Sequence, residues 1–204
     1  MPLPEPTITR LPLYLRCLDR LHESGEVAVD SQTLAQMAGV GAHNLRKDLA
    51  YLGNLGTRGS GYDIVHLRET ISSILGADRT WNVAICGVGN LGTAFAKYLS
   101  STQDRFMLTH LFDVDPQKLD TTVAGIRVVH NDQMGARLIE GGPHLGIIST
   151  PPESALDVAR LLASYGVRSM LNFAPVHIDL GPANLVRNVD VGLHLLMLSY
   201  HEML

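Results

Sequence analysis

The apolar positions in the first third of the chain recur with the spacing of a helix. One run lies within residues 9–23 and is followed by Gly25, a typical helix stop. A second helix is expected to start at Asp30 or Ser31, because either side chain can cap its first turn. After a turn at residues 39–41, a third helix is expected from apolar side chains at helical intervals: Leu45, Leu49 and Leu52. Two short helices joined by a glycine turn predict a helix-turn-helix.

Glycines interrupt the pattern after the third helix and predict a hairpin. They occupy positions 53, 56, 59 and 61, and an extended segment at residues 62–65 follows them. A further helix is expected over residues 67–75, and residues 76–78 are expected to link it to the rest of the chain. We therefore expect residues 1–78 to form a winged-helix domain, with the hairpin as its wing.

From Trp81 onward, short apolar strands alternate with helices. Strands are expected at residues 82–86, 108–112, 128–129, 145–149 and 169–173, and the clearest helices at residues 93–99 and 154–165. Such alternation predicts a parallel sheet with right-handed crossovers and helices on both faces. The expected fold class is therefore α/β: the winged-helix domain, a doubly wound Rossmann domain at residues 79–189, and a C-terminal helix at residues 190–204.

The turn after the first of these strands carries a glycine motif, Gly87-Val88-Gly89-Asn90-Leu91-Gly92. Gly87 permits a tight turn, Gly89 lets the backbone approach a pyrophosphate, and Gly92 allows close packing of helix on strand. The helix N-terminus supplies N–H groups and a positive dipole to the phosphates. The motif predicts a dinucleotide site; a Rossmann-like turn that binds another ligand is the alternative.

Residues at the ends of other strands indicate which dinucleotide the site would hold. Asp113 ends the second strand, where a carboxylate would bind the ribose hydroxyls of an adenosine. Because Val114 and Asp115 follow without a cation, we expect NADH and NAD⁺ to be preferred over NADP(H). Three residues after later strands are also expected to contact the cofactor: Thr150, Pro151 and Asn172. The prolines that follow these strands could instead simply end them.

The second part of the chain leaves little room for catalysis. A nicotinamide dehydrogenase normally adds a domain that brings substrate to the cofactor, whereas the residues after Asp113 suffice only to complete the sheet. The nine histidines are scattered, without the spacing of a metal site or a His–carboxylate pair. We predict no catalytic or metal-ligating residue and favour a sensor. An NAD-dependent oxidoreductase with an appended helix-turn-helix interaction domain is the alternative.

The charge distribution leaves DNA binding open. The net charge is −4, but residues 1–79 carry eight Lys and Arg against nine Asp and Glu. The polar face of the third predicted helix, expected to enter the major groove, carries five candidate DNA-binding residues: His43, Asn44, Arg46, Lys47 and Tyr51. Arg58 would lie at the tip of the wing and contact the backbone or minor groove. A protein-interaction domain with a solvated charged face is the alternative.

The cysteines and the N-terminus bear on compartment and redox chemistry. Cys17 and Cys86 are too few for a disulfide framework and lie on apolar segments, so inert core residues are favoured over a thiol sensor. The N-terminus lacks a signal-peptide pattern, and no apolar run is long enough to span a bilayer. We therefore expect a cytoplasmic protein without a membrane partner.

Several of these segments together resemble the Rex family of redox-sensing transcriptional repressors. The matching segments are residues 45–49, 56–62, 88–92, 112–116 and 171–176. The resemblance extends from about Arg10 to Tyr200 and pairs two unrelated domain types in the order of the family. The recognition helix departs from the family at residues 43, 44 and 50, which bears on operator preference. Val191 stands where an aromatic can occur near the nicotinamide, which bears on ligand affinity.

The C-terminal helix bears on assembly. It is apolar on more than one face, which predicts a helix folded onto its own domain or, as the resemblance implies, one inserted into a partner subunit. The resulting homodimer would bind a palindromic operator in double-stranded DNA. The resemblance further implies that NADH closes the dimer and releases the operator, whereas NAD⁺ leaves the DNA-competent form largely intact.

Three residues are predicted to relay the binding of NADH to the DNA-binding domain. Arg16 lies on the first helix, Tyr98 on the helix behind the glycine motif, and Asp190 just before the C-terminal helix. We expect Asp190 to pair with Arg16 in the DNA-binding form and to turn toward Tyr98 when NADH is bound. Solvated surface charges at positions 16 and 190 are the alternative.

Overall fold

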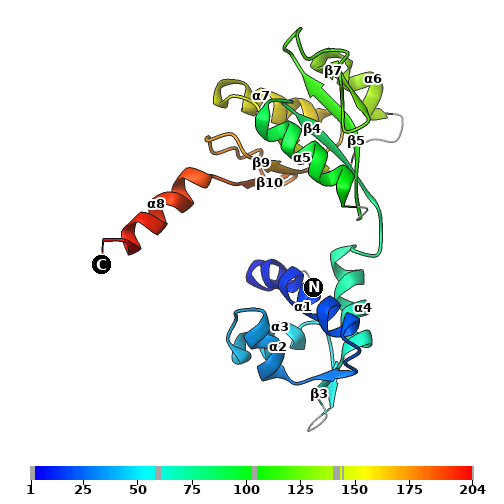
Figure 1. Ribbon diagram of the computed structural model, residues 1–204, viewed down its shortest axis with the longest axis vertical. Coiled ribbons are helices and arrows are strands. Elements are labelled where there is room, and N and C mark those ends of the chain that lie inside the picture. The colour runs from blue at the N-terminus through cyan, green and yellow to red at the C-terminus, as the bar shows by residue number, and fades with distance from the viewer. Residues whose placement is uncertain (1–2, 58–60, 103–104, 140–142, 144, 204) are drawn as a thin grey trace. The chain divides into compact units, whose positions relative to one another are not determined.

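The computed structural model describes residues 3–57, 61–102, 105–139, 143 and 145–203 (Figure 1). The chain divides into two compact units, residues 1–79 and residues 80–204. One cluster of buried apolar residues fills the first unit, and two clusters lie in the second. Each unit therefore has a core of its own.

The first unit combines four helices with a small sheet in its described part. Its elements are α1 (Glu5–Glu23), β1 (Ala28–Val29), α2 (Ser31–Met37), α3 (Ala42–Ala50), β2 (Gly56–Thr57), β3 (Gly61–Asp63) and α4 (Ile64–Leu75). Strand β3 lies between β1 and β2 and runs antiparallel to both. The predicted winged-helix order is confirmed, and α1 and α4 pack together beside the α2–α3 pair.

Local capping determines where the helices of this unit begin. Asp30, rather than Ser31, caps α2: its Oδ1 accepts the N–H of Gln32 at 2.7 Å and that of Thr33 at 3.0 Å. Gly39 adopts a φ of 67°, which lets the chain turn from α2 into α3 without strain. The segment 64–65, expected as extended, forms the first turn of α4, because the Asp63 carboxylate caps that helix.

The second unit is a doubly wound α/β sheet. Its strands are β4 (Trp81–Cys86), β5 (Phe106–Asp113), β6 (Thr122–Val123), β7 (Ile126–His130), β8 (Leu145–Ile148), β9 (Ser169–Asn172) and β10 (Leu185–Asn188). They lie in the order β10-β9-β8-β4-β5-β7-β6, and all neighbours are parallel except β6 and β7. The predicted Rossmann-type parallel sheet is confirmed.

Helices cover both faces of this sheet (Figure 1). The helices of this unit are α5 (Asn90–Ser101), α6 (Met134–Ile139, preceded by the short 3₁₀ helix η1 at Asn131–Gln133), α7 (Pro152–Ser164) and the terminal α8 (Val191–His201). Along β4, Val83 and Ile85 face the cluster that includes α5, whereas Ala84 and Cys86 face the cluster that includes α7. This alternation is expected for a strand that is buried on both sides. Because β4 lies between β5 and β8, its carboxyl end is at the topological switch point of the sheet.

The terminal helix α8 has no buried residue among its described positions. Its exposed apolar side chains, each at least 60% exposed, are Val191, Leu193, Leu195, Leu196, Met197, Leu198 and Tyr200. In the single chain, α8 therefore does not fold onto its own domain, contrary to that alternative. In the described part of the chain, no helix is long and apolar enough to cross a membrane.

Candidate functional site

The three motif glycines in the turn between β4 and α5 have different surroundings. Gly87 has a φ of 90°, and a Cβ there would lie 2.6 Å from the carbonyl oxygen of Ser149. A Cβ on Gly92 would collide with the carbonyl oxygen of Gly87, so this glycine lets α5 approach the turn. Around Gly89 the structure leaves open space, with no atom within 4 Å of the position that a Cβ would occupy. The protein itself therefore requires Gly87 and Gly92, whereas only a ligand would require Gly89.

Asp113 fastens this turn to the end of β5. It is 7% exposed, and its Oδ2 accepts the N–H of Val88 at 2.7 Å. Its Oδ1 accepts the N–H groups of Val114 and Asp115 at 2.8 and 2.9 Å. Burial alone would raise the pKa of Asp113, but the N–H donors and the Lys118 ammonium outweigh it and hold the pKa below its usual range. Asp113 is a fixed carboxylate at the predicted ribose position.

Lys118 corrects one prediction from the sequence. Its Nζ lies 3.2 Å from Oδ2 of Asp113 and 3.6 Å from Oδ2 of Asp115. The expectation that no cation accompanies the two carboxylates is therefore wrong. The chain turns after β5, with the N–H of Lys118 donating to the carbonyl oxygen of Asp115, and this turn brings the ammonium back to the strand end. The spacing of three residues between Asp115 and Lys118 was the available signal.

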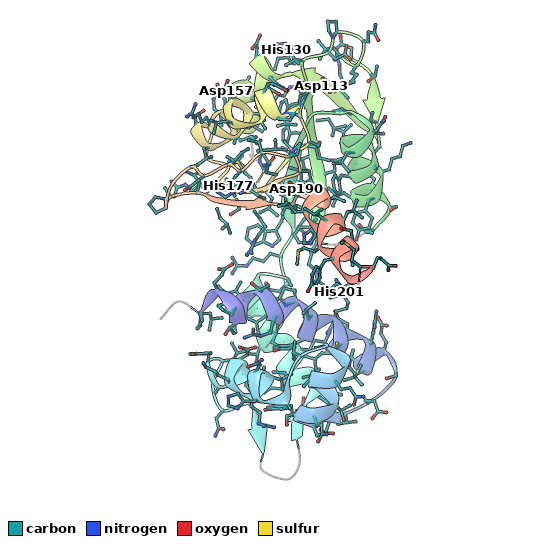
Figure 2. All side chains as sticks on the ribbon, turned by 90° about the vertical axis from the view of Figure 1, so that its left-hand side faces the viewer. Asp113, His130, Asp157, His177, Asp190 and His201 are labelled. Atoms are coloured by element: carbon teal, nitrogen blue, oxygen red, sulfur yellow. The ribbon has the colours of Figure 1, made fainter. Side chains whose placement is uncertain are left out.

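A cavity of about 430 Å³ opens at the carboxyl ends of these strands. It is lined by Gly87, Gly89, Asp113, Val114, Asp115, Lys118, Asn131, Ser149, Thr150, Pro151, Ser154 and Val158. Asp113 and His130 are register partners on β5 and β7, and Figure 2 shows both at this end of the sheet. The volume falls within the roughly 300–1,000 Å³ of small-molecule sites.

Two of the residues that line this cavity carry a buried polar atom without a partner. The Thr150 hydroxyl and the Asn131 Oδ1 are buried and have no hydrogen-bond partner among the described residues. Buried polar groups are normally paired, so such atoms are typical of a site that a ligand or water completes. Together with the open space at Gly89 and the carboxylate of Asp113, they fit a dinucleotide. Sequence reasoning found Thr150 but missed Asn131, which follows β7 with no motif around it.

The structure brings about half of the predicted cofactor residues to the cavity. Gly87, Gly89, Asp113, Thr150 and Pro151 line it. The other five predicted residues do not line the cavity: Val88, Asn90, Leu91, Gly92 and Asn172. Val88 and Gly92 are buried beneath the turn, while Asn90 and Leu91 form the more accessible first turn of α5.

Asn172 is bound within its own loop. It is fully buried, and its amide Nδ2 donates to the carbonyl oxygen of Val176 at 2.7 Å and to Oδ1 of Asn188 at 2.9 Å. Its Oδ1 accepts the N–H of Ala174 at 3.0 Å. With these partners, Asn172 holds the loop after β9 in shape rather than presenting a free amide to a ligand.

Helix α3 presents a polar face and buries its opposite side. All five residues predicted to bind DNA from this face are exposed: His43, Asn44, Arg46, Lys47 and Tyr51. The buried side of α3 consists of Leu45, Asp48 and Leu49. Arg46 also donates to the Ser31 hydroxyl at 3.2 Å, which joins α3 to the start of α2. Arg58, the predicted wing-tip residue, lies outside the described residues.

Asp48 is only 1% exposed, unlike its exposed neighbours Arg46 and Lys47 on α3. Arg10 binds it in a bidentate manner at 2.6 and 2.7 Å, and the hydroxyls of Tyr14 and Thr7 donate to it at 2.7 and 2.9 Å. Burial alone would raise the pKa of Asp48, but these hydrogen bonds outweigh it, and the pKa lies below its usual range. The network fixes α3 to α1 and removes the negative charge from the exposed face.

The three predicted relay residues are divided between the two units. Arg16 is exposed on α1 of the first unit, and Tyr98 is 62% exposed on α5 of the second. Asp190 caps α8, since its Oδ1 accepts the N–H of Leu193 at 3.2 Å (Figure 2). The pairing of Asp190 with Arg16 or Tyr98 stays a prediction.

Neither cysteine has the environment of a redox-sensing thiol. Cys17 is 5% exposed and Cys86 is fully buried. Burial raises the pKa of both thiols, and the carboxylate of Asp113 raises that of Cys86 further. A reactive thiol requires access and a lowered pKa, so these environments oppose the thiol-sensor alternative.

Comparisons with known proteins match both units. Residues 2–50 match the family described as "Putative DNA-binding protein N-terminus", and residues 78–176 match the family described as "CoA binding domain". Two crystal structures of the repressor RSP are similar to the whole chain. The complex with beta-NAD⁺ and operator DNA has a TM-score of 0.92 at 29% identity, covering 98% of this chain and 93% of that one. The complex with beta-NADH has a TM-score of 0.86 at 28% identity, covering 98% and 94%.

A curated relative from Streptomyces griseus is similar over nearly the full length. This redox-sensing transcriptional repressor Rex is 44% identical over 200 residues, which are 98% of this chain and 79% of the relative. The similarity spans both units and the connection between them, as the motifs in residues 45–49 and 88–92 predicted. The chain belongs to the Rex family of redox-sensing transcriptional repressors.

Proposed function

We propose that this chain is a transcriptional repressor that binds operator DNA as a homodimer and is released when NADH binds, so that it senses the NADH/NAD⁺ ratio. The observation that carries the proposal is the pairing of a winged helix with a dinucleotide-type cavity in one chain of the Rex family. The similar repressor RSP has been crystallised with beta-NAD⁺ and operator DNA, and with beta-NADH.

The dinucleotide would lie in the cavity at the ends of β4, β5 and β8. The backbone at Gly87 and Gly89 and the first turn of α5 would hold the pyrophosphate, because the helix start presents N–H groups and a positive dipole. Asp113 would accept a ribose hydroxyl, and the Thr150 hydroxyl would gain the partner that it lacks. NADH can release DNA only by binding the released state more tightly; a hundredfold difference corresponds to about 2.7 kcal/mol per site.

The exposed face of α3 would bind the operator. Lys47→Ala is expected to weaken operator binding roughly tenfold, and to reduce the slope of log affinity against log salt by about one for each lost phosphate contact. Fluorescence anisotropy of a labelled operator over a salt series measures both quantities. The matched control is Lys97→Ala, which removes an exposed lysine from α5 in the other unit. Equal losses in the two variants would contradict the assignment of α3.

The uncovered helix α8 would form the dimer by inserting into the partner. Its apolar side chains are exposed on more than one side of the helix in the single chain. Exposure of so much apolar surface to water is unfavourable and is typical of an interaction site. Leu196→Glu is expected to convert a dimer at micromolar concentration into a monomer, as measured by sedimentation equilibrium. Ser199→Glu places the same charge on a polar position of α8 and should leave the dimer intact. A Leu196→Glu chain that remains dimeric would rule out α8 as the interface.

The relay is tested most cleanly with Asp190→Asn. Asparagine retains a side-chain oxygen that can cap α8, so that the variant removes the charge with little effect on the helix. We expect NADH to bind within a few-fold of its normal affinity but no longer to release the operator. Asp179→Asn, at an exposed position of the same unit, serves as the control. A normal NADH response in Asp190→Asn would eliminate the relay.

We propose a sensor rather than an oxidoreductase, and a cytoplasmic location where operator DNA is accessible. Support comes from the relatives, which are named as transcriptional repressors. No group of three or more metal-ligating side chains that could hold an ion occurs among the residues described. An NAD-dependent oxidoreductase would instead oxidise or reduce a substrate with turnover of the bound nucleotide.

A further inference from the structure

The carboxylate of Asp113 is saturated with donors in this structure. Its Oδ1 accepts two backbone N–H groups, and its Oδ2 accepts the N–H of Val88 and the ammonium of Lys118. A carboxylate oxygen offers about two lone-pair positions, so both oxygens are fully used. The backbone donors are fixed by the turn, whereas Lys118 is held only through a flexible side chain. A ribose hydroxyl can therefore reach Asp113 only if Lys118 leaves it.

Lys118 has a second partner within reach. Its Nζ lies 3.6 Å from Oδ2 of Asp115, a residue whose side chain is 39% exposed. The Lys118 side chain is itself 36% exposed and lines the cavity. It can thus turn from Asp113 toward Asp115 and remain paired, at the edge of the space where the ribose would lie.

We propose that Lys118 is a specificity-determining residue for the 2′ position of the adenosine ribose. This inference rests on the proposed dinucleotide function of the cavity. With a 2′-hydroxyl, as in NAD(H), Lys118 turns to Asp115 and leaves Oδ2 of Asp113 to accept the hydroxyl. With a 2′-phosphate, as in NADP(H), the ammonium pairs with the phosphate and offsets part of its repulsion by Asp113 and Asp115. Lys118 therefore limits how strongly the two carboxylates exclude NADP(H).

The charges of this cluster support that effect. Asp113, Asp115 and Lys118 together carry one net negative charge, and without the lysine they carry two. A 2′-phosphate is itself negatively charged, so loss of the lysine removes an attraction that a 2′-hydroxyl does not have. Removal of Lys118 should therefore raise the preference for NAD(H) rather than lower it.

The test is a comparison of NADH and NADPH affinities in the full chain and in Lys118→Met, followed by the fluorescence of the reduced nicotinamide at fixed salt. We expect the ratio of the NADPH Kd to the NADH Kd to rise about tenfold in Lys118→Met. The NADH Kd should stay within about threefold or become lower, because Asp113 is freed. An unchanged or lowered ratio would overturn the proposal.

Two further variants separate charge from other effects. Lys118→Arg retains the cation and is expected to keep the ratio near that of the parent, whereas a rise equal to that of Lys118→Met would refute a role of the charge. Lys97→Met removes an exposed lysine of α5 that does not line the cavity, and it should leave the ratio unchanged. If the parent chain binds neither nucleotide, the proposed function fails and this inference with it. If NADH binds and the ratio does not respond, the inference about Lys118 alone fails.

Discussion

Replacement of Gly89 by valine is expected to weaken NADH binding by roughly a hundredfold or more, while the chain still folds and binds operator DNA. The valine side chain would enter open space, since no protein atom lies within 4 Å of the Cβ position. It would fill the part of the cavity where the backbone must approach the pyrophosphate. The result would be a repressor that NADH no longer releases. Calorimetric titration with NADH and operator binding by anisotropy measure the two effects.

The matched control for this variant is Ala94→Val on the exposed side of α5. It places a valine on the helix that follows the glycine turn, at a position that does not line the cavity, and NADH binding should stay normal. Thermal unfolding of both variants should lie close to that of the parent. If Gly89→Val binds NADH as tightly as the parent does, the phosphates do not lie at this turn, and the account of the cavity is wrong.

Replacement of Asp48 by asparagine is expected to cost about 3 kcal/mol of unfolding free energy in the first unit. The variant leaves Arg10 without its ionic partner and weakens the hydrogen bonds from Tyr14 and Thr7. Because this network holds α3 against α1, operator affinity should fall although residue 48 is buried away from the exposed face. Hydrogen exchange of the full chain, read separately for residues 1–79 and 80–204, locates the loss of stability.

Asp19→Asn provides the control for the Asp48 variant. Asp19 pairs with Arg68 at 2.6 Å, as short as the Arg10–Asp48 contact, but the side chains of this pair are 31% and 39% exposed. An ion pair of this kind contributes about 0–1 kcal/mol, because solvent screens it. Equal losses of stability in Asp19→Asn and Asp48→Asn would show that burial of the carboxylate does not matter.

The pH dependence of the first unit follows from the same network. Because the pKa of Asp48 is lower in the folded chain than in the unfolded chain, the unfolded state binds the proton more readily. The stabilisation is therefore fully present above the unfolded pKa of about 3.9 and is lost as pH falls through the folded value. In Asp48→Asn this part of the acid dependence of unfolding, followed by circular dichroism over a pH series, should be absent.

Much of the fold was accessible from the sequence because strong periodicities and capping residues mark it. The helix pair, the glycine turn and the buried strands β4, β5, β8 and β9 have such signals. The edge strands β6 and β10 were missed: β6 has two residues, and β10 has no buried side chain. Helix α5 begins at Asn90, before the predicted residue 93, because the motif itself forms the first turn.

The site was predictable where a motif fixes the backbone and less so where side chains meet across the fold. Gly87, Gly89 and Asp113 follow from the motif and its strand. Lys118 and Asn131 come from segments after β5 and β7, where the spacing from Asp115 was the signal for Lys118 and no motif marked Asn131. The burial of Asp48 was not predicted, because only the folded chain shows the three donor residues of α1 that compensate it.

The most direct test of the central claim is selection of duplex DNA from a random pool by the full chain, followed by titration of the bound complex with NADH, NAD⁺ and NADPH. We expect a palindromic site that NADH releases at far lower concentration than the other two nucleotides. Failure to retain any DNA at moderate salt, or retention of a site that NADH does not release, would contradict it.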